Sequence, residues 1–201
     1  MNLMTATGEY IFFIDRSGSM AGDRIEMAKE ALIVALKSLP PNSYFNIYSF
    51  GTSHSRLFPT NLECTEKNIN DAISRVSYFQ ADMGGTEILP PLLQAMTDPR
   101  RKNHPRSIFL FTDGAVTNTK SVLDNIETYS HRNRVFALGI GNGCSTELVQ
   151  GCADRGQGKA AFVSDPKDIS GRVITLITAA VVPVCDDFKL EYSDQSMIMM
   201  V

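Results

Sequence analysis

The sequence predicts an α/β fold: a doubly wound, mostly parallel sheet with helices on both faces and one antiparallel edge strand. Short hydrophobic runs alternate with segments of helical periodicity along most of the chain. The runs are apolar on both faces, which is typical of parallel strands covered by helices on each side. Right-handed crossovers between such strands give a Rossmann-like arrangement.

The expected strands are short apolar runs bounded by turn residues or polar residues. In chain order they cover Tyr10–Ile14, Tyr44–Phe50, Ser55–Phe58, Ser107–Phe111, Val135–Ile140 and Ala160–Val163. Pro59 closes the third of these runs, as expected for an edge strand. Phe188–Tyr192 alternates weakly and is a candidate for an added strand.

The expected helices have apolar residues three or four positions apart, so that one face is hydrophobic. They cover Arg24–Leu39, Glu66–Val76, Leu89–Met96, Thr119–Tyr129, Thr146–Cys152 and Pro166–Ala180. Asp23 and Thr65 are expected to be the N-caps of the first two helices. Pro90 and Pro91 confine the start of the third helix to their neighbourhood, because proline is tolerated only in the first turn.

Length and composition indicate one globular domain. The chain has 201 residues, of which 43% are hydrophobic and 20% charged, and one domain usually takes ~100–200 residues. We expect the domain to cover residues 8–182, with extensions at 1–7 and 183–201. The net charge of −3 does not favour nucleic-acid binding, which depends on lysine and arginine.

Other classes of protein are also disfavoured. The most apolar stretch, Val173–Val184, is shorter than the ~20 residues that a membrane span needs. Met1–Glu9 has no apolar core of a secretory signal. The four cysteines are scattered without a Cys-x-x-Cys pair, so a reduced, cytoplasmic protein without a zinc or redox motif is expected.

Two expected strands end in the same way, with an aspartate next to small residues. Asp15 follows the first strand directly, and Asp113 follows Ser107–Phe111 after one threonine. If these strands are parallel neighbours, both carboxylates point into one crevice at the carboxyl edge of the sheet. Like charges so close repel unless one is protonated or a cation lies between them. Taken singly, each aspartate is equally well explained as a turn residue or a helix cap.

Hydroxyl side chains lie close to these aspartates in the sequence. Ser17 and Ser19 flank Gly18, which allows the loop to bend so that both hydroxyls turn inward. Thr86, after Gly84 and Gly85, adds a third hydroxyl. Taken alone, its position is more typical of a helix N-cap. Such hard oxygen donors suit Mg²⁺, Mn²⁺ or Ca²⁺ and not zinc. The expected metal ligands, with Mg²⁺ as the first choice of cation, are Asp15, Ser17, Ser19, Thr86 and Asp113.

The motif Asp15-Arg16-Ser17-Gly18-Ser19, with Gly85-Thr86 and Thr112-Asp113-Gly114, resembles the von Willebrand factor A domain. The resemblance covers roughly residues 8–180, and the three segments in this order and spacing are highly specific. It implies that the strands ending at Asp15 and Asp113 are neighbours. It also implies a metal-ion-dependent adhesion site.

Carried over residue by residue, the resemblance gives each ligand a role. Ser17 and Ser19 would bind the metal directly, and Asp15 would act largely through water and by holding the serines. Thr86 and Asp113 would exchange between direct and water-mediated contact. Further runs are similar to a largely intracellular group of the family, whose members usually carry another domain, called VIT, before this one; those runs are Phe13–Met20, Tyr44–Ile47, Ala81–Leu89 and Leu138–Gly141.

The charges of such a site indicate its function. Two carboxylates just neutralise a dication, and hydroxyls add ligands without charge, so one coordination position stays open to water. An acidic side chain of a partner can take that position in a charge-assisted contact. The expected function is metal-dependent binding of a protein that supplies an Asp or Glu carboxylate, without catalysis and without a nucleic-acid or membrane partner.

Other functions fit the sequence less well. An A-domain scaffold with a vestigial metal site is one alternative. A Mg²⁺-dependent aspartyl-phosphate transferase would need an acid/base aspartate at position 17, where this chain has serine. The glycine run 139–143 lacks the spacing of a dinucleotide motif and is interpreted as a turn. Ser19 is not in the Gly-x-Ser-x-Gly context of a hydrolase nucleophile.

Overall fold

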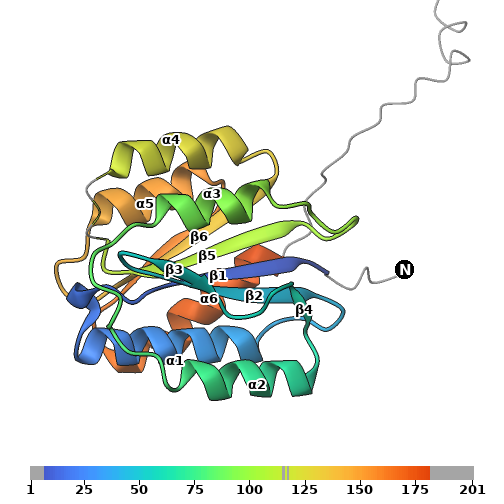
Figure 1. The fold of residues 1–201 in the computed structure, drawn as a ribbon, viewed down its shortest axis with the longest axis horizontal. Helices are drawn as coiled ribbons and strands as arrows, with labels where there is room; N and C mark the ends of the chain where they lie inside the picture. Colours follow the sequence, from blue (N-terminus) through green and yellow to red (C-terminus); the bar gives the residue numbers. More distant parts are fainter. Residues whose placement is uncertain (1–6, 115, 117, 182–201) are drawn as a thin grey trace, which may run out of the picture.

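A mostly parallel sheet runs through the centre of the molecule, and helices cover both of its faces (Figure 1). The computed structural model describes residues 7–114, 116 and 118–181. The strand order is β3-β2-β1-β5-β6-β7, with β4 paired to β2. The strands are β1 (Glu9–Asp15), β2 (Tyr44–Phe50), β3 (His54–Arg56), β4 (Leu62–Glu63), β5 (Arg106–Thr112), β6 (Asn133–Ile140) and β7 (Ala160–Val163).

This topology confirms the predicted fold class. β2, β1, β5, β6 and β7 pair in parallel, each with the next in this order. β3 is the expected antiparallel edge strand. β4, which the sequence did not predict, also pairs antiparallel with β2; with two residues it is too short to carry a periodicity.

The helices are divided between the two faces of the sheet. α1, α2 and α6 cover one face, and α3, α4 and α5 cover the other (Figure 1). Their bounds are α1 (Asp23–Lys37), α2 (Glu66–Val76), α3 (Leu89–Thr97), α4 (Thr119–Tyr129), α5 (Thr146–Arg155) and α6 (Ile169–Val181), with short 3₁₀ helices η1 (Gly18–Met20) and η2 (Pro166–Asp168). The six α-helices lie where helical periodicity was expected, whereas η1 falls in the segment expected to be a bent loop.

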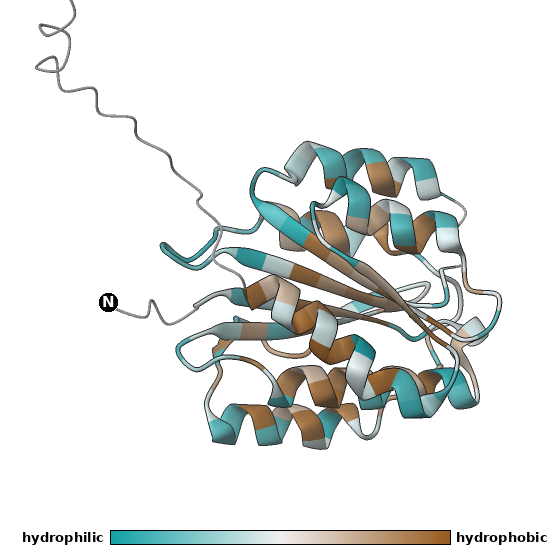
Figure 2. Cartoon of the chain, turned by 180° about the vertical axis from the view of Figure 1, so that it is seen from behind, coloured by the Kyte–Doolittle hydropathy of each residue, from teal (hydrophilic) through white to brown (hydrophobic). Residues whose placement is uncertain are grey.

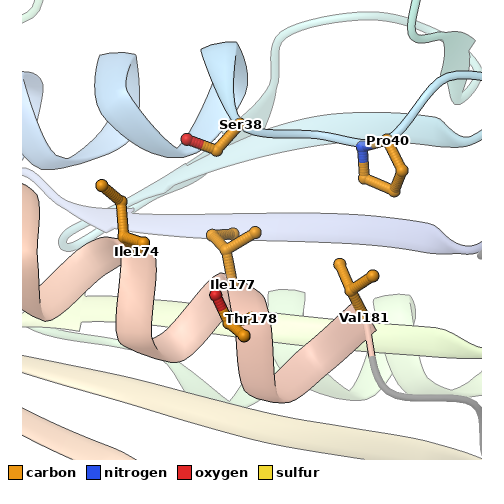
Figure 3. A pocket seen from close by; sticks show the side chains of 6 residues that line it. All are labelled: Ser38, Pro40, Ile174, Ile177, Thr178 and Val181. Carbon is orange, nitrogen blue, oxygen red and sulfur yellow. The ribbon is translucent and has the colours of Figure 1, made fainter.

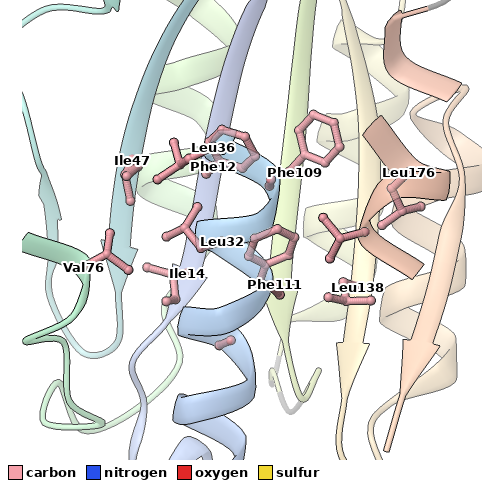
Figure 4. Close-up of a cluster of buried hydrophobic side chains, with 14 of the residues drawn as sticks. Phe12, Ile14, Leu32, Leu36, Ile47, Val76, Phe109, Phe111, Leu138 and Leu176 are labelled. Atoms are coloured by element: carbon pink, nitrogen blue, oxygen red, sulfur yellow. The ribbon is translucent and has the colours of Figure 1, made fainter. Parts of the chain in front are cut away.

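Strand side chains alternate between two hydrophobic cores. In β1, the side chains of Phe12 and Ile14 belong to the core between the sheet and α1. Those of Ile11 and Phe13 belong to the core on the other face of the sheet. Figure 4 shows Phe12 and Ile14 beside side chains of α1 and β5. The strands are largely hydrophobic in colour and the helices show both colours (Figure 2). Burial on both faces is what holds the strand ends in fixed positions.

The helix starts correct one prediction and confirm others. Asp23 is not the N-cap of α1: it is the first helical residue, and the cap is Gly22 with φ of 78°. The left-handed backbone of that glycine sets the start of the helix without a side-chain cap. Thr65 does cap α2, because its side chain accepts from the backbone N–H of Asn68. Pro90 lies in the first turn of α3, as expected.

An apolar groove lies between the ends of α1 and α6 (Figure 3). Its volume is about 340 Å³, and its lining comes from Ser38, Pro40, Ile174, Ile177, Thr178 and Val181. Ser38 and Pro40 follow the C-terminal end of α1, whereas Ser17 and Ser19 precede its N-terminal end. The groove is therefore at the opposite end of α1 from the predicted metal ligands.

Some expectations fall outside the described residues. The candidate strand Phe188–Tyr192 and the extensions 1–7 and 183–201 lie there, apart from Thr7. Within the described ranges, no helix has the length and hydrophobicity needed to cross a bilayer.

Candidate metal centre

The predicted ligands begin at the carboxyl edge of the sheet, where β1 and β5 end. These two strands are parallel neighbours, with Ile14 in register with Phe111. Asp15 is the last residue of β1, and Asp113 follows the last residue of β5. Sheet topology therefore brings together two carboxylates that are far apart in the sequence, as expected from the residues that follow the two strands.

Asp15 is fully buried and organises the turns that follow both strands. Its Oδ1 accepts from the backbone N–H of Ser17 at 2.9 Å, and its Oδ2 accepts from Thr112 Oγ1 at 2.6 Å. Thr112 Oγ1 in turn accepts from the backbone N–H of Gly114 at 2.9 Å. Burial raises the pKa of Asp15, the hydrogen bonds from Thr112 and Ser17 lower it, and the negative charge of Asp113 raises it.

The two serines present their hydroxyls side by side. Ser17 Oγ and Ser19 Oγ are 3.0 Å apart, and the 3₁₀ turn Gly18–Met20 sets this spacing. Ser17 is buried, whereas Ser19 is exposed. A pair of hydroxyl oxygens at this distance, one buried and one open to solvent, forms a potential edge of a cation site.

Asp113 lies on the same rim as Ser19. Nη1 of Arg24 donates to Asp113 Oδ2 at 3.0 Å and to the backbone carbonyl of Ser19 at 3.0 Å. One donor atom thus contacts both segments. Asp113 is almost buried, with 5% of its surface exposed, so its charge acts at short range on its neighbours.

The loop that carries Thr86 is fastened to the loop after β1. Gly84 accepts at its carbonyl from the backbone N–H of Gly18 at 2.7 Å. The N–H of Gly85 donates to Thr52 Oγ1 at 2.7 Å, and that of Glu87 donates to the Gly51 carbonyl at 2.8 Å. Thr86 lies between these contacts and is half-buried, so all three predicted segments converge at one edge of the sheet.

Arg16 joins the same two loops by its side chain. Its guanidinium contacts Asp82 at 2.6 Å and the Gln80 carbonyl at 2.9 Å, and it lies 4.5 Å from the ring centroid of Phe79. The backbone of Arg16 also accepts from the N–H of Met83 at 3.0 Å. These contacts hold the start of the loop that leads to Thr86.

Sequence reasoning missed three residues that shape this edge. Thr112 was placed after the expected strand and quoted in the motif before Asp113 but was given no role, although a threonine next to an aspartate at a strand end was the available signal. Arg16 and Arg24 were not assigned a role. A signal for Arg24 was its position in the first turn of a helix, where a positive charge opposes the helix dipole.

The donors are hard oxygen atoms. Two carboxylates and two serine hydroxyls converge here, with the loop that carries Thr86 bonded to the same turn. No cluster of three or more His, Cys, Asp or Glu suited to a metal occurs in the described part of the chain. The two buried carboxylates repel each other, and a cation between them would lower this repulsion. This donor set of oxygen atoms fits a divalent cation and contains no thiolate or imidazole ligand.

Comparisons with known proteins agree with the fold and the motif. A family model described as "von Willebrand factor type A domain" matches residues 8–162. The von Willebrand factor A domain-containing protein 5A of Homo sapiens is 40% identical over 194 residues, which cover 92% of this chain and 25% of that protein. The chain thus spans about a quarter of the length of this relative.

Solved structures share the architecture. A von Willebrand factor type A protein from Catenulispora acidiphila superposes with a TM-score of 0.74 at 22% identity, over 88% of this chain and 43% of that one. Proximal thread matrix protein 1 from the mussel byssus, solved with a zinc-occupied MIDAS motif, gives a TM-score of 0.69 at 18% identity, over 88% of this chain and 48% of that one. The chain therefore belongs to the von Willebrand factor type A domain family, a fold of protein interaction.

Proposed function

We propose that this domain binds a partner protein through a divalent cation, with Mg²⁺ as the expected ion. Asp15, Ser17, Ser19, Thr86 and Asp113 would hold the cation, directly or through water. The cation would supply a Lewis-acidic position that accepts an Asp or Glu carboxylate of the partner. The observation that carries the proposal is the convergence of the two serine hydroxyls, 3.0 Å apart, with the carboxylates of Asp15 and Asp113.

The buried and the exposed residues of the site have different proposed roles. Asp15 has both carboxylate oxygens engaged by Ser17 and Thr112, so it holds the loops and supplies negative charge from below. Ser19 is exposed and lies at the entrance that an incoming carboxylate would use. Because the surrounding strands are buried on both faces, the loops start from fixed points, which limits the entropy lost on binding.

Binding is favoured over catalysis for this site. An aspartyl-phosphate mechanism needs an acid/base group beside the first aspartate, and Ser17 stands there. The proposal includes a cytoplasmic location, which rests on the scattered cysteines. It also includes a preceding VIT domain, which rests on the resemblance to the intracellular group.

Metal binding is tested by thermal unfolding of protein treated with EDTA and then titrated with Mg²⁺ or Mn²⁺. A ligand at about 100 times its dissociation constant stabilises the folded state by ~2.7 kcal/mol. We expect a rise in Tm for the wild type and none for Ser17→Ala/Ser19→Ala. A variant that loses two exposed serines elsewhere, Ser74→Ala/Ser121→Ala, is the matched control and should respond like the wild type.

Partner binding is tested with the immobilised domain. Proteins retained in Mg²⁺ and released by EDTA are identified, and acidic residues of the retained segment are changed to the corresponding amides. We expect Asp113→Ala to abolish this EDTA-sensitive retention while the domain stays folded. Retention of the same protein with equal strength in EDTA contradicts a metal-mediated contact.

A further inference from the structure

Arg24 occupies an unusual position for a helical arginine. It is the second residue of α1, where the positive end of the helix dipole disfavours a cation. Its side chain turns back over the start of the helix and contacts the carbonyl of Ser19 and the carboxylate of Asp113, both at 3.0 Å. The helix dipole therefore does not explain why an arginine lies at position 24, whereas the ion pair with Asp113 does.

The turn after β6 leaves room for this side chain. Gly141 has φ of +88°, and a Cβ built at this position would lie 2.8 Å from Arg24 Nε and 3.3 Å from its Cδ. Any other residue would therefore push the guanidinium away from its present path. Gly141 belongs to the glycine run 139–143, which was interpreted as a turn. The absence of a side chain at Gly141 also leaves the space through which the Arg24 side chain reaches Asp113.

The ion pair with Asp113 is formed in partly dry surroundings. The Asp113 side chain is 4% exposed and that of Arg24 is 38% exposed, so the pair is open to solvent from the arginine side only. A charge so placed interacts more strongly with its partner than a fully exposed one does. The Asp113 carboxylate therefore already has a positive neighbour supplied by the chain itself.

We propose that Arg24 is a built-in cation that competes with the divalent ion for Asp113 and so sets the affinity of the metal site. This inference rests on the proposed function, because it assigns a competitor to one of the proposed ligands. Binding of the divalent ion brings two positive charges next to the guanidinium, which weakens metal binding relative to a site with a neutral residue at position 24. Arg24 is thus a positioning residue for Asp113 and a determinant of metal affinity, not a ligand.

The first test measures the affinity for Mn²⁺ by isothermal titration calorimetry. A unit charge close to a dication changes affinity on the order of tenfold even at a water-like dielectric constant. We expect Arg24→Gln to bind Mn²⁺ about tenfold more tightly than the wild type, and Arg24→Lys, which keeps the charge, to stay much closer to the wild type. Arg155→Gln removes a positive charge from α5, where Arg155 pairs with Asp124 and Glu127, and should leave the affinity unchanged.

The second test separates charge competition from a structural role. In EDTA, Arg24→Gln should unfold at a lower temperature than the wild type, because Asp113 loses its counter-charge. In saturating Mn²⁺ this difference should shrink or reverse, since the cation replaces the counter-charge and binds the variant more tightly. A residue that served only packing would lower Tm by the same amount in both conditions, and that result overturns the inference.

The outcomes for the two proposals are distinguishable. If the wild type binds Mn²⁺ and Arg24→Gln binds it equally or more weakly, the role of Arg24 is wrong and the metal site stands. If neither protein binds Mn²⁺, the metal site itself is wrong and the role of Arg24 falls with it. If only Arg24→Gln binds Mn²⁺ in the measurable range, competition by the arginine is supported in its strongest form.

Discussion

Thr112 Oγ1 donates a 2.6 Å hydrogen bond to Oδ2 of Asp15 and accepts from the backbone N–H of Gly114. One hydroxyl thus ties the end of β5 to the buried carboxylate at the end of β1 and starts the turn that carries Asp113. Since the bond is to a carboxylate with no exposed surface, little water can replace it. This contact therefore helps to fix the relative positions of the two strand ends at the candidate site.

Thr112→Val should therefore destabilise the domain and weaken metal binding together. The substitution keeps the shape of the side chain but leaves a buried carboxylate oxygen and the N–H of Gly114 without their partner, at a cost of about 1.5–3 kcal/mol. Urea denaturation in EDTA measures the change in unfolding free energy. Thr112→Ser retains the hydroxyl and should lie closer to the wild type; equal stability of the valine and serine variants would contradict the role of the hydrogen bond.

Glu9 and Arg106 form a buried ion pair at the opposite edge of the sheet. Nη2 of Arg106 lies 2.8 Å from Glu9 Oε2, and both side chains are 1% exposed. Arg106→Met should destabilise the domain by about 3–5 kcal/mol, because it leaves an uncompensated buried carboxylate. Chemical denaturation measures this loss, which should leave the Mn²⁺ affinity of the folded protein unchanged.

A double variant and a neighbouring arginine are the controls for this ion pair. Glu9→Leu/Arg106→Met removes both charges and should be more stable than Arg106→Met alone. Arg101, 4.0 Å from Glu9 Oε1 and half-exposed, should change stability by no more than about 1 kcal/mol when replaced by glutamine. If Arg101→Gln is as damaging as Arg106→Met, burial is not the cause.

Gly141→Ala and Gly143→Ala should separate backbone strain from displacement of Arg24. Both glycines have positive φ, +88° and +84°, so alanine at either costs about 1–2 kcal/mol of stability. A Cβ at Gly141 meets Arg24 Nε, whereas a Cβ at Gly143 meets nothing within 4 Å. Only Gly141→Ala should therefore displace the Arg24 side chain and raise the Mn²⁺ affinity in calorimetry. Equal affinities for the two variants would argue against the proposed effect of Arg24 on the metal site.

Hydrophobic periodicity predicted the architecture. The aspartates that follow two of the strands predicted that Asp15 and the segment of Asp113 lie at the same edge of the sheet. That inference needed only two apolar runs with carboxylates after them and the rule that parallel strands end at one edge. Thr65 was identified as a cap because its side chain acts within the same turn of chain. Each of these features is local, or depends on sheet topology alone.

The remaining features depend on contacts that a linear pattern does not contain. Arg24 and Asp113 are 89 positions apart, and their contact follows from the relation between the start of α1 and the end of β5. Asp23 was wrongly identified as a cap because residue types alone do not show the φ of 78° at Gly22, after which α1 begins. β4 escaped prediction because two residues become a strand only through their pairing with β2.

Buried thiols should make the domain lose stability at alkaline pH. Burial raises the pKa of Cys152 and that of Cys64 from 9.0 to about 12. Well below pH 9 both thiols are neutral in the folded and unfolded states, so they leave stability unchanged. Above pH 9 the thiols of the unfolded chain ionise while those of the folded chain stay protonated, which favours unfolding by up to about 1.4 kcal/mol per thiol and pH unit until the folded thiols ionise near pH 12.

Urea denaturation under reducing conditions between pH 8 and 11 measures this loss, and Cys152→Ala isolates one thiol from the other groups that titrate there. The variant should be less stable than the wild type at pH 8, because it leaves a small cavity at a fully buried position. The difference should narrow as the pH rises, since only the wild type carries the ionising thiol at position 152. A difference that stays constant from pH 8 to 11 would mean that Cys152 ionises equally in both states, contrary to its burial on the inner face of α5.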